Sequence, residues 1–299
     1  MQNKNIKKAF TLLEMVFVVV LTSILSLGMF KAFEALYIRS AKAKATTELS
    51  MQSQITLNQI SRLLYDRIPN SVIGFNTTTN SCETIEDGIG TFQVLEWLSL
   101  DSEQLLDGNY SGFVDMNASS RPDIHTPNTN ALNITNRNLI FAGTLDGGPE
   151  EITACNGAYG WHGNDSNLSH GIGSVSANTI TLDVTAIDYP PRYIYEKYYL
   201  TNGAYAIARG EDIDLTSSCI TDLDITVDNN TLFLFYNFYP YNGQTFCADG
   251  GSGKVSILAE NVTGFRARHE NDIIRLSIDM NQTIRGSSDV RISKQKAVF

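Results

Sequence analysis

Glu14 is the first residue whose chemistry needs an explanation, because it stands inside a long apolar run. The stretch KNIKKAFTLLEMVFVVV, residues 4–20, begins with lysines and carries one carboxylate among its apolar residues. As a helix, the apolar run 10–30 would span roughly 31 Å, about the thickness of a bilayer's hydrocarbon core. A carboxylate at that depth costs on the order of 2.5–3.5 kcal/mol on insertion scales, and such residues usually serve a function. Glu14 is therefore the leading candidate functional residue.

The cysteines are the next residues that can do chemistry. The chain has four of them, Cys82, Cys155, Cys219 and Cys247. Lys4, Lys7 and Lys8 precede the apolar run, so the positive-inside tendency keeps the short head in the cytoplasm and exports the rest, where disulfides persist. Four cysteines allow three connectivities. Because two of them flank one strand-rich stretch, the spacing favours Cys219–Cys247, which leaves Cys82–Cys155 by elimination.

Other clusters of polar residues give weaker signals. The segment WHGNDSNLSH places His162, Asp165 and His170 in one loop, but a metal site would need tighter spacing or a ligand on a rigid element. A polar surface loop without metal is the favoured interpretation. The acidic segments 210–215 and 221–230 lack EF-hand spacing, so calcium remains a minor alternative to no cofactor at all. No arrangement of nucleophile and base stands out, and we expect no enzyme activity.

Composition excludes one class of partner. The 299 residues carry 22 Lys and Arg against 32 Asp and Glu, a formal net charge of −10. Binding to a phosphate backbone needs clustered basic residues, so we expect no nucleic acid partner.

One long helix must position Glu14. The helical pattern continues past Lys31 without Gly or Pro to Ile68, where Pro69 and Asn70 end it. From residue 10 to 68 it would be roughly 88 Å long, far more than a membrane needs. Its outer half should therefore pack on a globular domain along an apolar stripe, which Ser53 interrupts. The stripe comprises Ala45, Leu49, Leu57, Ile60, Leu64 and Ile68.

The remainder of the chain predicts an antiparallel sheet. Residues 71–173 read as mostly irregular, with either one short helix or a strand with a helix within 91–106 and a strand at 138–143. From Asn178 onward strands dominate, with a tight hairpin predicted at Asn202-Gly203 and a turn at residues 228–230. Hairpin-linked strands after one long helix indicate an α+β fold.

The segment AFTLLEMVFVVVLTSILSL, residues 9–27, resembles the N-terminal signal of type IV prepilins and type II secretion pseudopilins. The resemblance implies cleavage between Ala9 and Phe10, although Gly is usual where Ala9 stands. Phe10 becomes the N-methylated mature terminus. Glu14 then pairs with the Phe10 amine of a neighbouring subunit, and is paired only in the polymer. At low dielectric such a pair is strongly attractive, and either member alone is costly.

Two further segments are similar to the large J-type minor pseudopilin and the W-type minor pilin. They are the RIPNS segment, residues 67–71, and the late strands within 257–280. The resemblance implies a type IV pilin-like α+β fold, with a long helix packed on an antiparallel sheet and an elaborated irregular middle region. It divides the chain into a leader (1–9), a transmembrane and filament-core helix (10–30), an amphipathic outer half (31–70) and an exported β-rich domain (71–299).

The resemblance implies a non-enzymatic minor subunit of a type IV pilus or a type II secretion pseudopilus, near the filament tip and aiding assembly initiation. Its partners would be other pilins or pseudopilins, the prepilin peptidase and an inner-membrane assembly platform. The expected location is the inner membrane, crossed once, with the C-terminal domain in the periplasm or at the filament tip or cell surface. A membrane-anchored exported binding or adhesion protein is the alternative, and a tethered enzyme is a third interpretation.

Overall fold

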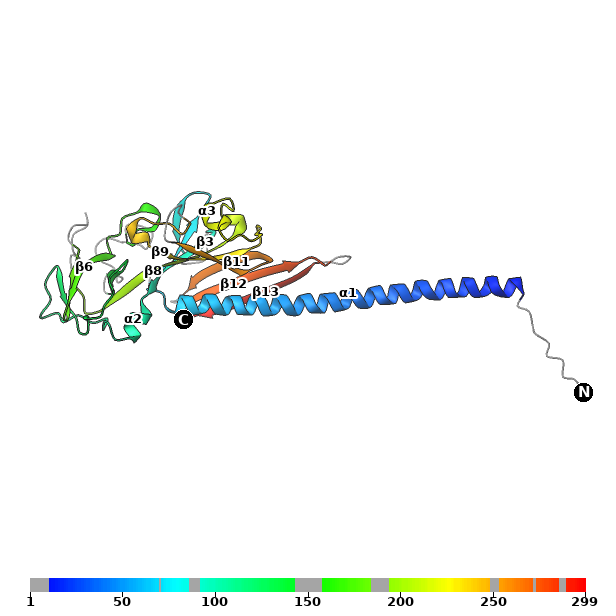
Figure 1. Ribbon diagram of the computed structural model, residues 1–299, viewed down its shortest axis with the longest axis horizontal. Coiled ribbons are helices and arrows are strands. Elements are labelled where there is room, and N and C mark those ends of the chain that lie inside the picture. The colour runs from blue at the N-terminus through cyan, green and yellow to red at the C-terminus, as the bar shows by residue number, and fades with distance from the viewer. Residues whose placement is uncertain are drawn as a thin grey trace, which may run out of the picture. The chain divides into compact units, whose positions relative to one another are not determined.

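Helix α1, Leu12–Tyr65, is the longest element of the computed structural model and runs without a break for 54 residues (Figure 1). Good helix formers dominate it, and Gly28 is its only glycine, so backbone propensity and hydrogen bonding support the whole length. The structure describes residues 11–69, 71–85, 92–142, 158–183, 194–247, 253–270, 273–284 and 289–299.

The helix ends three residues earlier than the sequence predicts. Beyond Tyr65 the backbone pairs with a strand instead, since Arg67 forms a bridge with Ser99 and the amide of Ile68 donates to the carbonyl of Leu98 at 2.9 Å. The guanidinium of Arg67 also donates to the carbonyl of Leu64 at 2.9 Å, which satisfies one of the last helical carbonyls. Sheet pairing therefore ends the helix before Pro69 is reached.

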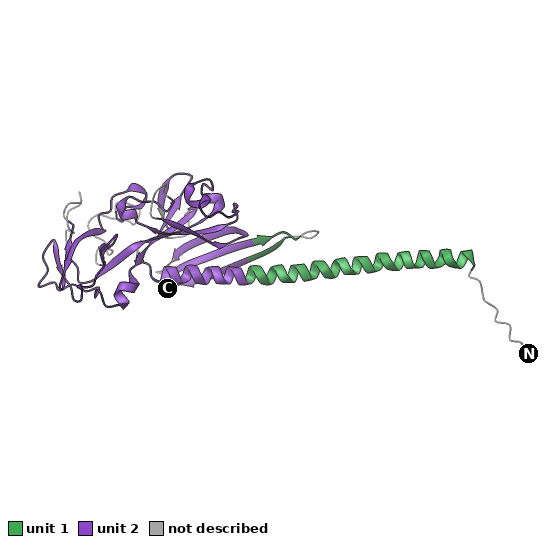
Figure 2. Ribbon diagram, viewed as in Figure 1, with its two compact units in different colours: residues 1–50, 281–292 green, residues 51–280, 293–299 purple. Residues whose placement is uncertain are grey.

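The chain divides into two compact units, which Figure 2 colours separately. Unit 1 comprises residues 1–50 and 281–292, and unit 2 comprises residues 51–280 and 293–299. The division into segments at residues 9, 30 and 70 that the sequence predicts stays a prediction.

The predicted stripe of α1 is confirmed. Six apolar residues are buried, namely Ala45, Leu49, Leu57, Ile60, Leu64 and Ile68. Ser53, which seemed to interrupt the stripe, is fully buried as well. Within unit 2, the hydroxyl of Thr56 donates to the carbonyl of Leu258 at 3.3 Å, and Nζ of Lys296 donates to Oδ1 of Asn58 at 2.7 Å. The last turns of the helix therefore pack on the β domain, as an α+β fold requires.

Among the described residues, the larger sheet has ten strands, and their pairs are antiparallel. Its order is β2-β1-β3-β8-β5-β6-β7-β4, and β9 pairs with both β8 and β10. The strands are β1 (Ile73–Asn76), β2 (Ser81–Thr84), β3 (Val94–Leu100), β4 (Asp123–His125), β5 (Asn138–Phe141), β6 (His170–Ser176), β7 (Thr179–Leu182), β8 (Tyr198–Arg209), β9 (Leu232–Phe238) and β10 (Lys254–Ala259). Short helices α2 (Ser102–Leu106) and α3 (Ser218–Thr221), with 3-10 turns η2 (Trp161–Gly163), η3 (Gly210–Asp212) and η4 (Pro240–Asn242), connect them.

Strand β8 pairs with three other strands of this sheet. The prediction of a hairpin at Asn202-Gly203, within β8, is wrong. The strand runs straight through both residues, pairing with β3 along one edge. Along its other edge it pairs first with β5, at Tyr198 to Thr201, and then with β9 from Ala204 onward. Gly203 has φ of 137° at this change of partner, a conformation that glycine adopts without strain.

The middle region is more regular than the sequence predicts. Strands β1 to β6 lie within residues 71–176, and β3 sits at the centre of the sheet. Strand β3 was hard to predict because it is short and buried on both faces, so its sequence lacks the alternation of apolar and polar residues that marks a half-buried strand. Of the two alternatives for residues 91–106, the strand with a helix is confirmed, as β3 and α2, and the strand predicted at 138–143 is confirmed over 138–141, as β5. The turn at 228–230 is also confirmed, since the amide of Asn230 donates to Oδ1 of Asp228 at 2.9 Å.

A second sheet closes the chain, in the order β11 (Val262–Glu270), β12 (Ile273–Gln282) and β13 (Val290–Val298) (Figure 1). One face of β12 is buried through Ile274, Leu276, Ile278 and Met280. Its other face carries the polar residues between them, so β12 shows the period of two that a half-buried strand requires.

Candidate functional site: the exposed start of the long helix

The first half of α1 exposes its apolar side chains. Large apolar residues from Leu12 to Tyr37 are exposed, among them Leu12 at 83% and Phe17 at 66%. Exposing so large an apolar surface to water is unfavourable, so this surface indicates contact with a membrane or with another protein. By length and composition, α1 is the one helix among the described residues that could cross a membrane.

Polar side chains within this segment bond to their own helix. The hydroxyl of Thr22 donates to the carbonyl of Val18 at 2.9 Å, and that of Ser23 donates to the carbonyl of Val19 at 2.7 Å. Such internal bonds remove the cost of placing a hydroxyl in an apolar medium. Gly28 has no neighbour within 4 Å of the position of an added Cβ, so its bare face is open to another helix.

Glu14 lies in the first turn of this helix and has a hydrogen-bond partner nearby in the sequence, Thr11, which was not predicted. The Oε2 atom of Glu14 accepts from the backbone amide of Thr11 at 3.4 Å and from its hydroxyl at 3.5 Å. In return, the amide of Glu14 donates to the hydroxyl oxygen of Thr11 at 3.4 Å. This reciprocal arrangement is a capping box, and its Thr-x-x-Glu signature is readable in the sequence.

Glu14 therefore has a hydrogen-bond partner in its own chain, whereas its pairing with the Phe10 amine of a neighbouring subunit stays a prediction. In a single chain its carboxylate already lies at a helix N-terminus, where unpaired amides and the helix dipole stabilise negative charge. The bonds to Thr11 are long, so Glu14 remains able to accept a stronger donor. The predicted processing residues, Ala9 and Phe10, lie outside the described residues, and their roles stay predictions.

Residues 4–30 match the family model described as the prokaryotic N-terminal methylation motif. The match supports a type IV prepilin-like protein. The matched stretch covers Glu14, Thr11 and most of the exposed apolar helix. It suggests a structural subunit that is processed by a prepilin peptidase, anchored in the membrane by one helix and assembled with pilins or pseudopilins. No curated protein and no solved structure matches the chain.

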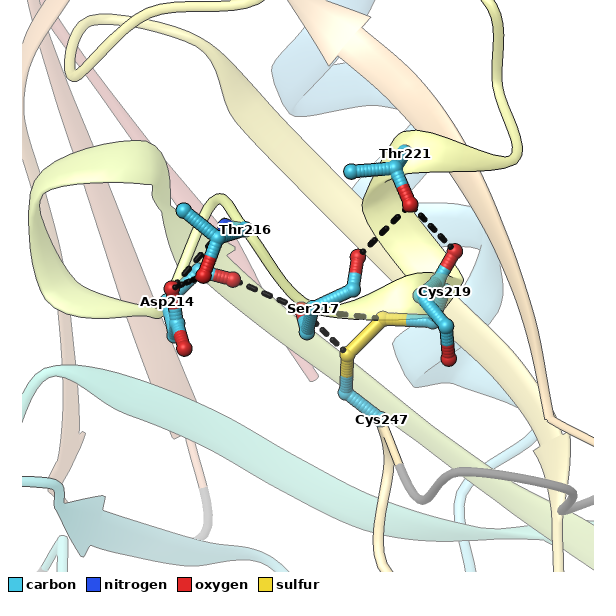
Figure 3. Close-up of a disulfide and its surroundings, with 7 residues drawn as sticks. Asp214, Thr216, Ser217, Cys219, Thr221 and Cys247 are labelled. Atoms are coloured by element: carbon cyan, nitrogen blue, oxygen red, sulfur yellow. Dashed lines mark hydrogen bonds between the residues drawn. A yellow bond between two sulfur atoms is a disulfide. The ribbon is translucent and has the colours of Figure 1, made fainter.

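The disulfide between Cys219 and Cys247 is formed, as the spacing of the two cysteines favours (Figure 3). It joins α3 to the segment after η4, across 28 residues. The hydroxyl of Ser217 lies 3.2 Å from Sγ of Cys247 and donates to the carbonyl of Asp214 at 2.6 Å. Disulfides persist in oxidising compartments, which agrees with an exported domain for this prepilin-like chain.

The other predicted pair is Cys82–Cys155. Cys82 lies on β2, opposite Phe75 of β1, whereas Cys155 lies outside the described residues. That pairing stays a prediction.

The loop with His162, Asp165 and His170 is a polar surface loop only in part, because Asp165 is exposed whereas His162 is half-buried and His170 is buried. His162 lies in η2, and its Nε2 atom is 3.1 Å from both carboxylate oxygens of the fully buried Glu96. His170 is buried on β6, and burial lowers its pKa to about 4. The two histidines therefore belong to the interior, which periodicity could not show because each stands outside a regular pattern.

The described residues contain no group of three His, Cys, Asp or Glu side chains placed to hold a metal ion. The acidic segment 210–215 is organised internally instead. Oδ1 of Asp214 accepts from the amide and hydroxyl of Thr216, and these bonds lower the pKa of Asp214. Calcium binding stays an untested alternative.

Proposed function

We propose that this chain is a minor pilin or pseudopilin, a non-enzymatic subunit of a type IV pilus or type II secretion pseudopilus. The observation that carries the proposal is the exposed apolar start of α1, which opens on a capped carboxylate at Glu14 inside the matched methylation motif. The apolar surface of such a helix surrounds it on all sides. Lipid covers this surface before assembly, and the helices of other subunits cover it afterwards.

During assembly, the carboxylate of Glu14 exchanges one hydrogen-bond partner for another. In the membrane, the carboxylate rests on the amide and hydroxyl of its own Thr11. After cleavage of the Ala9–Phe10 bond, the methylated Phe10 amine of a neighbouring subunit supplies a cationic donor. A charge-assisted bond is stronger than the long neutral bonds that it replaces, so the subunit joins the filament in one register.

The subunit resides in the inner membrane with its disulfide-bearing domain in the periplasm, where sibling pilins, the peptidase and the assembly platform act on it. A position near the tip, with a role in starting assembly, rests on the similarity to J-type and W-type subunits. Two features support it. Arg67 of the segment like theirs forms a bridge with Ser99 of β3, and the late segment comprises the end of β10, β11 and most of β12.

The first experiment measures the intact mass and N-terminal sequence of the protein from native membranes. A mature chain that begins at methylated Phe10 is the expected result. A chain that still begins at Met1 in cells with an active prepilin peptidase would overturn the proposal and favour a membrane-anchored binding or adhesion protein.

Substitutions at Glu14 separate its two contacts. A capping box accepts Gln as well as Glu, so Glu14→Gln keeps the cap but removes the charge. We expect Glu14→Gln and Glu14→Ala to be processed normally and to be absent from sheared filaments. Glu34→Gln is the matched control, because Glu34 is an exposed carboxylate on the same helix. Full incorporation of Glu14→Gln into filaments would show that the charge of Glu14 is not needed for assembly and that the residue serves only as a helix cap.

Copy number tests the minor role and the place of the subunit. We expect quantitative mass spectrometry of sheared filaments to find few copies per filament, and deletion to lower the number of filaments rather than their length. An abundance equal to that of the principal subunit would identify a major pilin instead.

A further inference from the structure

Four segments of the chain fit the acceptor pattern of bacterial N-glycosylation. The core of that pattern is Asn-x-Ser/Thr, where x is not proline, and bacterial sites add an acidic residue two positions before the asparagine. The pattern has meaning only in a protein that leaves the cytoplasm, a condition that the exported domain proposed above meets. The segments are DGNYS (107–111), DMNAS (115–119), DSNLS (165–169) and DMNQT (279–283). Because the four patterns are equivalent as sequence, only the structure can distinguish them.

Asn117 lies in an exposed turn between α2 and β4. Both ends of the turn are bonded to β4, since the amide of Asp115 donates to the carbonyl of His125 and the amide of His125 donates to the hydroxyl oxygen of Ser119, each at 2.8 Å. Within the turn, Oδ1 of Asp115 accepts from the amides of Asn117 and Ala118 at 3.0 and 3.3 Å. These bonds hold the backbone and leave the four residues from Asp115 to Ala118 exposed.

The side chain of Asn117 is accessible. Among the described residues, its side-chain amide has no hydrogen-bond partner, because Asn117 takes part in the turn through its backbone. The residue after it, Ala118, is exposed as well. An enzyme can therefore enclose the segment around Asn117 without displacing a side chain of the apolar core.

Ser119, the last residue of the pattern, needs only a local rearrangement to be recognised. It is half-buried, and its hydroxyl donates to the carbonyl of Asp115 at 2.7 Å and accepts from the amide of His125 at 2.8 Å. Both bonds belong to the turn and its anchor on β4, and neither involves an apolar core side chain. Local opening of such an exposed turn costs far less than opening of the core.

Two of the other asparagines are held by the fold. Asn281 is half-buried on β12, and its Nδ2 atom, the atom that would carry the sugar, already donates to Oδ2 of Asp289 at 3.5 Å. Asn109 is half-buried too, and the next residue, Tyr110, is buried with its hydroxyl bonded to the carbonyl of Asp101. Reaching either asparagine would require part of the protein to unfold.

Asn167 is exposed, but the residues that follow it are not. Leu168 and Ser169 are buried, and the hydroxyl of Ser169 accepts from Nδ2 of Asn138 at 3.0 Å. The hydroxyl that the acceptor pattern requires two residues after the asparagine is therefore out of reach while the interior is intact. Of the four segments, 115–119 is the one that the folded protein can offer to an enzyme.

We propose that Asn117 is N-glycosylated on the folded, exported domain. The co-substrate is an oligosaccharide joined through a diphosphate to a polyprenol lipid, and the enzyme is a membrane-bound oligosaccharyltransferase. A bond forms between Nδ2 of Asn117 and C1 of the first sugar while the bond between C1 and the diphosphate oxygen breaks. The lipid diphosphate leaves with the electron pair of the broken bond, and a base of the enzyme takes the amide proton.

Asp115 has two separable roles in this proposal. Its Oδ1 atom caps the turn, and its charge forms a charge-assisted contact with a basic group of the enzyme. An asparagine at this position can accept the same two amide bonds but carries no charge. Asp115→Asn therefore removes the charge and leaves the turn in place, whereas Asp115→Glu keeps the charge.

The first test analyses the full-length protein purified from native membranes. After digestion, mass spectrometry with fragmentation that preserves the glycan locates sugars on individual residues. We expect a glycan on Asn117 and none on Asn109, Asn167 or Asn281. An unmodified Asn117 would overturn the proposal, and so would a glycan attached to Ser119 instead. Equal glycosylation of Asn281 and Asn117 would show that the folded structure does not select the site, which would overturn it as well.

Variants made in the same host test the acceptor and the acidic residue. Asn117→Gln and Asp115→Asn should lose the glycan, and Asp115→Glu should keep it. Asn133→Gln is the matched control, because Asn133 is exposed within an Asn-x-Thr pattern but has Ala131 in place of the acid, so the glycan should be unchanged. Undiminished glycosylation of Asp115→Asn would contradict recognition of the acidic residue.

The N-terminal sequence of the same sample separates this proposal from the proposed function. A chain that begins at Met1 and carries a glycan on Asn117 would overturn the pilin assignment alone. A chain that begins at methylated Phe10 and has an unmodified Asn117 would overturn the glycosylation alone.

Discussion

The imidazole of His162 lies 3.1 Å from both carboxylate oxygens of Glu96, which is fully buried on β3. The ring of His162 stacks on Phe75 with centroids 3.5 Å apart, and Phe246 contacts its edge. His162 also has φ of 51°, the left-handed region, which non-glycine residues seldom adopt. A buried acid thus ties the loop around η2 to the centre of the larger sheet.

Replacing His162 with Leu should destabilise the protein by about 1–3 kcal/mol, because it leaves the buried side chain of Glu96 without its hydrogen-bond partner. The double variant Glu96→Leu/His162→Leu should recover much of that loss, since no buried polar group then lacks its partner. Urea unfolding of the three proteins measures the coupling. Additive losses would show that the two side chains act separately.

His170 predicts a dependence of stability on pH. Burial lowers the pKa of His170 from 6.5 to about 4, so the folded state resists protonation that the unfolded state accepts. The free energy of unfolding should therefore be full above pH 6.5 and should fall as the pH drops toward 4, by about 2–3 kcal/mol in total.

The control for this pH dependence is His170→Asn, which keeps a polar side chain but cannot titrate. Subtracting its pH profile from that of the unaltered protein removes the contributions of the other histidines. A difference that stays constant between pH 7 and pH 4 would contradict the assignment.

Removing the Cys219–Cys247 disulfide should lower the free energy of unfolding by roughly 3–4 kcal/mol, the entropy of a closed loop of this length. The cysteines are 28 residues apart, and Ser217 and Ile220 pack beside them. The variant Cys219→Ser/Cys247→Ser is compared with the unaltered protein by urea unfolding. An unchanged midpoint would mean that the surrounding contacts hold this loop without the bond.

Asp101 should be one of the most sensitive residues outside the apolar core. It is fully buried, caps α2 through the amide of Gln104 and binds the guanidinium of Arg137. Asp101→Asn keeps the cap but removes the charge, so we expect a loss of about 2–3 kcal/mol. Glu48→Gln, which breaks the exposed pair with Lys44 at 3.6 Å, should cost less than about 0.5 kcal/mol. Similar losses in both variants would contradict the role of burial.

The sequence by itself predicted the features that depend on local chemistry. The long helix and its buried stripe from Ala45 to Ile68 follow from the helical period of the apolar residues. For residues 91–106 local patterns left two alternatives, one short helix or a strand with a helix. The apolar start of α1 and the carboxylate of Glu14 within it were also readable, because both can be recognised without knowing any distant part of the chain.

The tertiary structure decided the features that depend on distant residues. Strand β8 passes through Asn202-Gly203 because β3, β5 and β9 supply its partners from far along the chain. The pairing of His162 with Glu96 likewise joins residues that no local pattern relates. Turn propensity and hydropathy report a residue's neighbours in the sequence, whereas strand register and burial are set by the whole packed sheet, which can override them.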